Sequence, residues 1–406
     1  MSVGGSQAHA WIRHRNRALV LNIIRRGVRV SRTDIARDSH LSLPTISQIT
    51  QALMLEGMIE EIAVGPSRGG RRPVLLAIRP DYGWVVGMKV FAETIDVAVT
   101  NYLGELIASR EVQTSTNEIQ HVVATMAEIV KAFSLSETRF PGKCLGVGVA
   151  VPGTVSQSNG LIHNCPLGWR EVNFRALLRS ALGLPVMVDN DVNILAQGHL
   201  LFGHAQGRQN VIVVTLGRGF GLGIIIHGEV YRGTDGAAAE VGHIPWRPTP
   251  FRCECGRNDC IENFVTDRAA LLHYRELTGV TEPLTIEALR ALCGQGESAA
   301  VSVFEAIGAE VAKAICILVR IFAPEVIILS GEGLGAGPAL TETIAQKWRQ
   351  YCSEDSYASV QWVLDSWDNF HWARSAVSLV FDELTFPEVF RSLRPGTADA
   401  KEGGIM

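Results

Sequence analysis

The sequence predicts a winged helix-turn-helix over residues 1–80, followed by an α/β domain over 81–385 and a C-terminal tail over 386–406. Two observations support this division. Apolar residues recur at helical spacing in the first part of the chain, and from about residue 82 they alternate as in strands. Beyond that point strands and helices repeat in two similar halves, which is typical of an α/β fold. An apolar content of 47% fits a chain with a sizeable core.

The two parts of the chain differ in charge. Residues 1–80 contain twelve arginines, no lysine and five acidic residues, a net charge of +7. The whole chain carries −4, which leaves −11 on the remainder. A basic module on an acidic body indicates a polyanionic partner for the module alone, although an ordinary solvated face would carry the same charge.

We expect a cytoplasmic protein with no membrane association. There is no run of about eighteen uncharged apolar residues, the length that a transmembrane helix needs. The N-terminus lacks the apolar core of a signal peptide. Five cysteines are scattered in mostly apolar context, as expected of reduced thiols: Cys144, Cys165, Cys293, Cys316 and Cys352.

Three short helices are expected in the N-terminal module. Ser31 is a good N-cap and Asp34 stands at the capping-box position, while Ser42 can cap the next helix with Pro44 in its first turn. In the third helix, apolar residues including Leu55 are expected to face inward. The helices are expected over 13–27, 31–40 and 41–61. A tight turn between the second and third makes this a helix-turn-helix.

The exposed start of the third helix is the candidate DNA-reading surface. In a helix-turn-helix this helix enters the major groove, so Thr45, Ser47 and Gln48 would face base edges.

Residues 62–78 predict two short strands around a tip rich in glycine and arginine, which is a wing. Arg68, Arg71 and Arg72 on this wing would meet phosphates or a minor groove. The alternative is a helical protein-interaction module with a basic hairpin.

The large domain reads as alternating strands and helices. Consecutive antiparallel strands with a turn near Asn101 come first, then a helix over 119–134 and a buried strand that ends in a Pro-Gly turn. Later segments predict a strand, a polar corner and a helix (184–203), a strand pair around a glycine-rich turn (210–233), a long apolar helix (297–324) and a strand with a glycine turn (325–335). Ligands in such folds bind at the carboxyl ends of strands.

A histidine and three cysteines offer a metal site. His243, Cys253, Cys255 and Cys260 lie within about eighteen positions, and one imidazole with three thiolates is a complete tetrahedral set for zinc. Because no coordination position stays open, the metal would be structural. The alternative is a loop with cysteines and no metal.

Spare carboxylates and an acidic corner indicate a polar pocket. Glu240 and Glu262 bracket the metal-binding segment, and neither is needed by zinc. The corner Asp189-Asn190-Asp191 follows an apolar strand, and Asn193 or Asp189, rather than Asp191, is the candidate helix cap. An amide beside a carboxylate suits the paired hydroxyls of a sugar.

These motifs together resemble the ROK family of sugar kinases and sugar-responsive repressors. The resemblance rests on the DNDVN corner, the EVGH motif, the C-x-C-x4-C-x-E knot and the VPGTV turn, and it runs from about residue 82 to 384. It implies the two-lobed actin-like ATPase fold and a zinc ion held by the histidine and cysteines named above. The sugar contacts it implies are Asn190, Asp191, Glu240, His243 and Glu262. The winged helix-turn-helix matches the repressor branch, which includes the N-acetylglucosamine, glucose and xylose repressors.

The chain departs from the kinases of this family at their phosphate loops. Lys89 replaces the acid of the first loop, and Phe91-Ala92-Glu93 replace its Gly-Gly-Thr. A phosphate loop needs small residues so that its N–H groups can reach the anion. The second loop reads Gly217-Arg218-Gly219 and lacks the usual threonine, while Asp259 replaces a glycine before the last cysteine. The sugar site is therefore expected to be intact and the ATP site broken.

The sequence thus predicts a sugar-responsive DNA-binding repressor with structural zinc and no enzyme activity. Its expected partners are operator DNA, a sugar or sugar-phosphate inducer, and a second or further copies of itself as a dimer or tetramer, since two-fold operators need two reading modules. The alternatives are a ROK sugar kinase with an attached DNA-binding domain, and a repressor controlled by a transport protein.

Overall fold

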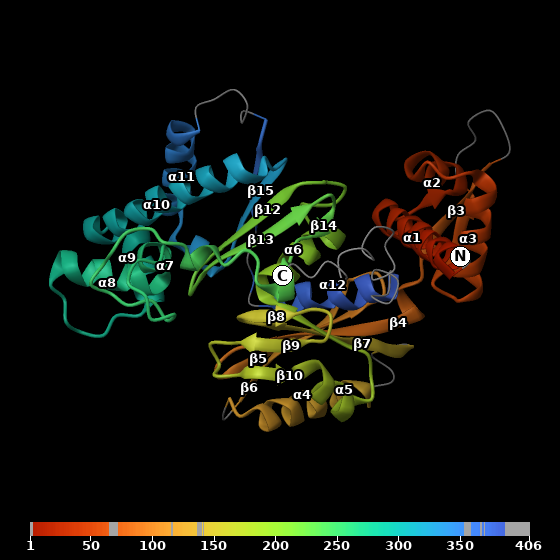
Figure 1. Ribbon diagram of the computed structural model, residues 1–406, viewed down its shortest axis with the longest axis horizontal. Helices are drawn as coiled ribbons and strands as arrows, with labels where there is room; N and C mark the ends of the chain where they lie inside the picture. The colour runs from red at the N-terminus through yellow and green to blue at the C-terminus, as the bar shows by residue number, and fades with distance from the viewer. Residues whose placement is uncertain are drawn as a thin grey trace, which may run out of the picture. The chain divides into compact units, whose positions relative to one another are not determined.

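The computed structural model describes residues 3–64, 72–114, 117–135, 140, 142–352, 359–365, 368 and 370–385 (Figure 1). The chain divides into two compact units, residues 1–191 with 372–406 and residues 192–371. The predicted tail, 386–406, lies outside the described residues. No helix in the described part is long and apolar enough to cross a bilayer.

Two five-stranded sheets of identical topology form the centres of the two units. In each, three consecutive antiparallel strands are followed by two parallel ones, in the orders β6-β5-β4-β7-β11 and β14-β13-β12-β15-β16. The predicted repetition in two similar halves is confirmed. The first sheet comprises β4 (Gly83–Val90), β5 (Thr94–Asn101), β6 (Leu106–Gln113), β7 (Lys143–Val151) and β11 (Val186–Asn190). The second comprises β12 (Val211–Leu216), β13 (Phe220–Ile226), β14 (Glu229–Val230), β15 (Val326–Ser330) and β16 (Gln361–Leu364).

In the first unit, helices cover both faces of the sheet. Alternate β4 residues, including Trp84 and Met88, join the core beneath α4 (Ile119–Ser134) and α5 (Phe174–Leu182), which lie together in Figure 1. The opposite face lies against α12 (His371–Thr385) at very close range, because a Cβ at Gly148 would overlap the carbonyl oxygen of Ala376. A small sheet of β8 (Thr154–Ser156), β9 (Leu161–Asn164) and β10 (Arg170–Asn173) completes this part.

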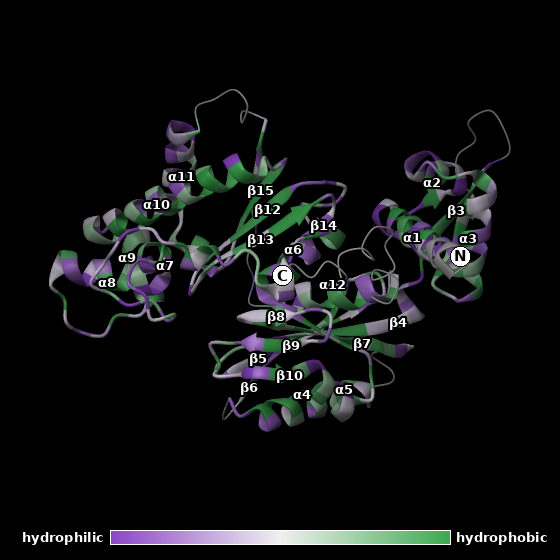
Figure 2. Ribbon diagram, in the orientation of Figure 1, coloured by the Kyte–Doolittle hydropathy of each residue, from purple (hydrophilic) through white to green (hydrophobic). Residues whose placement is uncertain are grey.

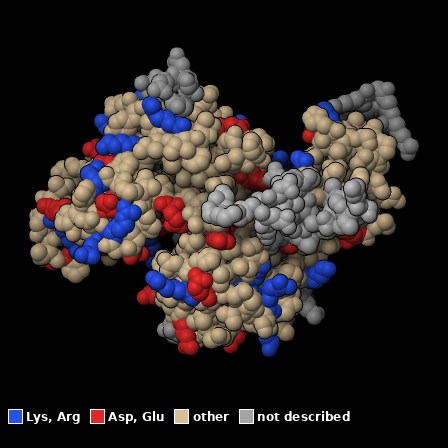
Figure 3. Space-filling view, in the orientation of Figure 1, with Lys and Arg blue, Asp and Glu red and all other residues tan. Residues whose placement is uncertain are grey.

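In the second unit, the apolar strands β12, β13 and β15 pack against a layer of helices (Figure 2). The long helix α10 (Ser298–Phe322) contributes the largest share of that core and packs along α11 (Pro338–Tyr351). Helix α6 (Asp191–Phe202) covers the other face, where Gly223 leaves room for Ala196. The remaining helices are α7 (Glu262–Val265), α8 (Asp267–Thr278) and α9 (Ile286–Gly294). Acidic and basic side chains are interspersed over the surface of this unit (Figure 3).

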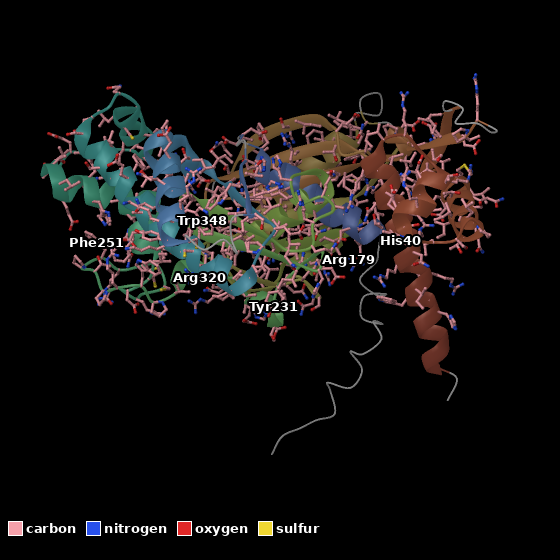
Figure 4. All side chains as sticks on the ribbon, turned by 90° about the horizontal axis from the view of Figure 1, so that it is seen from above. His40, Arg179, Tyr231, Phe251, Arg320 and Trp348 are labelled. Atoms are coloured by element: carbon pink, nitrogen blue, oxygen red, sulfur yellow. The ribbon has the colours of Figure 1, made fainter. Side chains whose placement is uncertain are left out.

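The N-terminal module contains three helices and an antiparallel hairpin. The helices are α1 (Val3–Gly27), α2 (Arg32–Ser39) and α3 (Leu43–Leu55), and the hairpin pairs β2 (Ile59–Val64) with β3 (Val74–Ile78), to which β1 (Val30–Ser31) adds a short edge. The predicted caps are confirmed: Ser31 and Asp34 bond reciprocally as a capping box, and Ser42 accepts from the Thr45 N–H with Pro44 in the first turn. Helix α2 ends at His40, labelled in Figure 4, in a left-handed conformation.

Two predictions for the third helix were wrong. The helix ends at Leu55 rather than continuing to residue 61, because Gly57 adopts a φ of +78° and the chain turns into β2. Leu55 was expected to face inward but is 82% exposed, since the last turn of the helix projects past the core formed by Ile46 and Leu53.

Two cysteines that look scattered in the sequence meet in the fold. Cys316 on α10 and Cys352 after α11 are both buried, and their sulfur atoms lie 2.6 Å apart. Their proximity follows from the packing of α10 against α11, which sequence spacing does not reveal.

The close approach of α12 to the first sheet gives a stability prediction. Gly148→Ala should lower the free energy of unfolding by about 1–3 kcal/mol, because the added methyl must push α12 off the sheet. The matched control is Gly294→Ala, where a Cβ meets no atom within 4 Å; it should be neutral or stabilising by up to about 1 kcal/mol. Chemical denaturation measures both, and equal effects would contradict this packing.

Candidate functional site

The predicted zinc ligands come together in the second unit. One ligand atom from each of His243, Cys253, Cys255 and Cys260 lies within 4.8 Å of all the others. His243 Nδ1 is 3.5 Å from Cys253 Sγ, and the Cys255 and Cys260 sulfur atoms are 3.4 Å apart. Thiolates on tetrahedral zinc, with Zn–S near 2.3 Å, are separated by about 3.8 Å. The donor set and its spacing therefore fit one zinc ion.

Main-chain hydrogen bonds shape the loop that carries the cysteines. The Cys253 N–H donates to the Arg257 carbonyl at 2.7 Å, and the Trp246 N–H donates to the Asp259 carbonyl at 2.7 Å. The loop passes Phe251, labelled in Figure 4. Asp259, the departure from the family pattern, makes a two-bonded ion pair with Arg257 at 2.9 Å, which holds the pKa of Asp259 below its usual range. This residue is accommodated without displacing a ligand.

Glu262 lies beside the cluster, and Glu240 lies three residues before His243 in the chain. Glu262 Oε2 is 3.7 Å from His243 Nδ1 and 3.4 Å from Cys253 Sγ, while its other oxygen is 3.4 Å from the Phe220 N–H nitrogen. Glu240 is exposed and precedes the short helical turn Val241–His243. In this arrangement His243 presents Nδ1 to the thiols, so Nε2 is the nitrogen left for another ligand.

The polar corner of the first unit is joined by a lysine that sequence reasoning had placed only in a phosphate loop. Asn190 donates from Nδ2 to the Gly153 carbonyl at 2.9 Å, which ties the corner to the Pro-Gly turn. Asp191 accepts a short hydrogen bond from Lys89 Nζ, and Lys89 is only 3% exposed. The Lys89 ammonium also lies 5.4 Å from the centre of the Trp372 ring. The Asp191 carboxylate, 16% exposed, is thus held in an ion pair with a buried lysine.

Asp96 faces Lys89 across the β4–β5 pair but is not its hydrogen-bonded partner. The two residues are in register, yet Lys89 bonds to Asp191. Burial of Asp96, with repulsion from Glu111 and only partial compensation by Lys89, raises its pKa to about 6.

The tight connection between β4 and β5 stands at the position of the first phosphate loop. The Phe91 N–H donates to the Thr94 carbonyl at 2.8 Å, so this amide is used by the turn between β4 and β5. The Glu93 carbonyl accepts from the Thr114 N–H at 2.7 Å. The Phe91 amide is therefore not available to bind a phosphate.

In the second unit, a carboxylate occupies the glycine-rich turn. Glu332 Oε1 accepts the Arg218 N–H at 3.1 Å, and a Cβ at Gly217 would overlap this carboxyl group. Backbone N–H groups in a glycine turn are the donors that hold phosphates. Here the Glu332 carboxylate is the anion that accepts from such a donor, the Arg218 N–H. The glycine turn at 331–333 was predicted from the sequence, but the contact of Glu332 with the other glycine turn was not.

The predicted DNA contacts are partly described. Ser47 and Gln48 are exposed on α3, on the side opposite buried Ile46 and Thr50. Thr45 is half-buried and its hydroxyl lies 2.8 Å from that of Ser42, so it takes part in the helix cap. Of the predicted wing arginines, Arg72 is exposed. Arg68 and Arg71 lie outside the described part of the chain.

Comparison with known proteins places this architecture in a family. Residues 85–382 match the ROK family. A xylose repressor of Caldicellulosiruptor bescii is 29% identical over 366 residues, which cover 86% of this chain and 90% of its own. A ROK family transcriptional regulator, a homologue of the E. coli MLC protein, has a TM-score of 0.81 at 24% identity and covers 94% of this chain and 99% of its own. A Streptomyces griseus ROK glucokinase, solved with glucose and AMPPNP, has a TM-score of 0.64 at 24% identity and covers 73% and 99%.

The cysteine cluster gives a metal prediction. Cys255→Ser should lose one equivalent of zinc relative to wild type and unfold more easily, because structural zinc contributes folding free energy. Cys144→Ser, a cysteine outside the cluster, should keep the wild-type zinc content. Elemental analysis with thermal unfolding measures both properties. A Cys255→Ser protein with unchanged zinc would rule out this ligand set.

The raised pKa of Asp96 gives a pH prediction. The pKa of Asp96 is about 6 in the folded state, whereas its usual value is 3.8. The contribution of this group to the free energy of unfolding is therefore fully present below about pH 4 and is lost as the pH rises through 6. Asp96→Asn should therefore raise the melting temperature above pH 6 and leave it unchanged near pH 4. Exposed Asp81→Asn serves as the control. A stabilisation of equal size at both pH values would refute the assigned cause.

Proposed function

Because the chain belongs to the ROK family, we propose that it is a sugar-responsive transcriptional repressor rather than a sugar kinase. One observation supports a repressor over a kinase. The groups that would handle phosphate are engaged by the chain's own side chains, Lys89 with Asp191 and Glu332 with the Arg218 amide. The basic N-terminal module supplies a function that a kinase does not need.

We assign operator binding to the N-terminal module as a winged helix-turn-helix. Helix α3 buries Ile46, Thr50 and Leu53 and leaves Ser47 and Gln48 exposed near its start, as a recognition helix requires. The scaffold behind it is braced: Arg17 on α1 makes two hydrogen bonds to Glu56, at 2.5 and 2.6 Å. A rigid frame of this kind fixes the angle at which α3 meets the groove.

Sugar binding is assigned to the five residues that the family resemblance implies. Asn190 and Asp191 supply an amide and a carboxylate, and Glu240 and Glu262 supply two more carboxylates, all suited to hydroxyl groups. His243 would serve zinc through Nδ1 and the sugar through Nε2. Zinc, bound by His243, Cys253, Cys255 and Cys260, would be structural: it fixes the imidazole and the loop and takes no part in chemistry.

Sugar occupancy is proposed to reach the DNA-binding module through packing within the first unit. Arg25, near the end of α1, is buried with its guanidinium 5.4 Å from the Tyr102 ring centre and 4.9 Å from that of Phe381 on α12. A change in α12 would therefore be felt at α1. A ligand shifts DNA affinity only by its differential affinity for the two states, and this contact is where the states would differ.

The working protein is proposed to be a cytoplasmic homodimer or tetramer, since a two-fold operator needs two recognition helices about one helical turn apart. A repressor controlled by a transport protein is the competing form of regulation. A thermal-shift screen of sugars and sugar phosphates, with xylose included because a relative is a xylose repressor, separates the two: only a sugar sensor gains stability from a small ligand.

The helix and the wing should contribute differently to DNA binding. Gln48→Ala should relax base preference at one operator position, at a cost of about 1–3 kcal/mol. Arg71→Ala with Arg72→Ala should weaken binding to all sequences and reduce the salt slope by up to about two phosphate contacts. Fluorescence anisotropy over a salt series measures both effects. If the two variants change affinity alike across sequences, the assignment of helix and wing is wrong.

Asp191 should be needed for induction and not for repression. Asp191→Asn keeps the shape but removes the charge, so it should bind operator with near wild-type affinity and fail to be released by the inducing sugar. The substitution also leaves Lys89 buried without its carboxylate, which should cost about 3 kcal/mol of stability.

The control for that cost is Lys89→Met combined with Asp191→Asn, which removes both charges. This double variant should recover stability and still fail to be induced. Operator titration with and without the sugar measures the outcome. Normal release of either variant by the sugar would exclude Asp191 from the ligand site.

A further inference from the structure

A second cluster of metal-type ligands lies in the second unit, away from the cysteine knot. His199, Asp365 and His371 each present one ligand atom, and the three atoms lie within 4.8 Å of one another. All three side chains are buried. Two imidazoles and a carboxylate form a donor set used by zinc and by other first-row divalent metals. The sequence did not reveal this cluster, because His199 is more than 160 positions away from Asp365 and His371.

The three ligands come from three elements that end or begin at one place. His199 is on the last turn of α6, Asp365 follows β16, and His371 starts α12. The Asp365 N–H donates to the Leu329 carbonyl at 2.8 Å, which aligns Asp365 with the end of β15. The His371 N–H donates to the Asp368 carbonyl at 3.1 Å, which sets the first turn of α12.

Both imidazoles point Nε2 at the same carboxylate oxygen. Asp365 Oδ2 lies 3.0 Å from His371 Nε2 and 3.4 Å from His199 Nε2, and it also accepts the Ser330 hydroxyl at 2.7 Å. The His199 Nε2 atom is buried and makes no hydrogen bond of acceptable geometry, despite this proximity. A cation among the three groups would give that nitrogen the electron-pair acceptor it lacks.

The surroundings fix the ligands in the orientation that a metal site requires. Ser330 donates to Asp365 Oδ2 and so fixes the carboxylate, as outer hydrogen-bond partners do for ligating carboxylates. Gly203 makes room for the His199 ring, since a Cβ there would lie 2.5 Å from His199 Nδ1. On the solvent side, His204 is half-exposed with Nε2 3.8 Å from Asp365 Oδ1. This imidazole lies outside the group of atoms within 4.8 Å of one another and would supply a fourth ligand by turning toward it.

We propose that His199, Asp365 and His371, with His204 closing the fourth position, bind a divalent transition-metal ion of the zinc type. The ion would join the last turn of α6 to the segment that follows β16, within the second unit, which ends at His371. It is separate in residues and in ligand chemistry from the cysteine site, since one set contains three thiolates and the other none.

The difference in ligands makes the two sites separable by spectroscopy. Full-length protein stripped with a chelator is titrated with Co²⁺, which gives intense thiolate charge-transfer absorption only at the cysteine site and weaker visible bands at an imidazole–carboxylate site. Wild type should bind two equivalents. Cys255→Ser with Cys260→Ser should bind one, without charge transfer, and His199→Gln should bind one, with charge transfer intact.

The matched control is His121→Gln, an exposed histidine on α4, which should still bind two equivalents. One equivalent in wild type, or two in His199→Gln, would overturn the proposal. If His199→Gln does not fold, His204→Gln decides, because that ring is half-exposed and its loss removes no buried group. Affinity at the thiolate-free site should then fall at least about tenfold, and an unchanged affinity would overturn the proposal.

Discussion

The buried ion pair between Lys89 and Asp191 is the interaction on which this account of the protein depends. It joins the end of β4 to the first residue of α6, with the Trp372 ring beside the ammonium. The Asp191 carboxylate is directed at a fixed cation, and it can still accept a hydrogen bond from a sugar hydroxyl. Taking the proton of that hydroxyl would leave the buried Lys89 ammonium facing a neutral acid, which is unfavourable for a buried charge. The pairing favours recognition over chemistry.

Glu332 applies the same principle in the second unit. By accepting the Arg218 N–H, it places a fixed negative charge in the turn where a nucleotide phosphate would need donors. Two departures from the kinase pattern, far apart in sequence, thus act in the same direction. Glu332 places a side-chain carboxylate on a turn amide, and Lys89, at the first phosphate-loop position, pairs with Asp191. Under the proposed function, the fold would retain its sugar site while losing group transfer, and the basic N-terminal module would respond to the bound ligand.

Sequence motifs that span a few residues predicted the local structure correctly. They did not predict contacts between residues that are distant in sequence. The capping box at Ser31 and the Pro-Gly turn at Gly153 are encoded within a few residues, and both are present. The cluster of His243 with three cysteines was predictable because its members are close in sequence. By contrast, the Lys89–Asp191 pair and the His199 cluster depend on strand order and helix docking, which spacing does not encode. The prediction that Leu55 faces inward was wrong for a related reason, because helical periodicity does not show where the core ends.

The most direct test of the central claim combines operator release and sugar chemistry in one sample. Labelled operator DNA is followed by anisotropy while the sugar identified by thermal shift is added, first without nucleotide and then with Mg·ATP, and the sugar is recovered for analysis. The account predicts release by the sugar alone, no change on adding Mg·ATP, and unmodified sugar at the end. Release only in the presence of Mg·ATP, or recovery of a phosphorylated sugar, would contradict it.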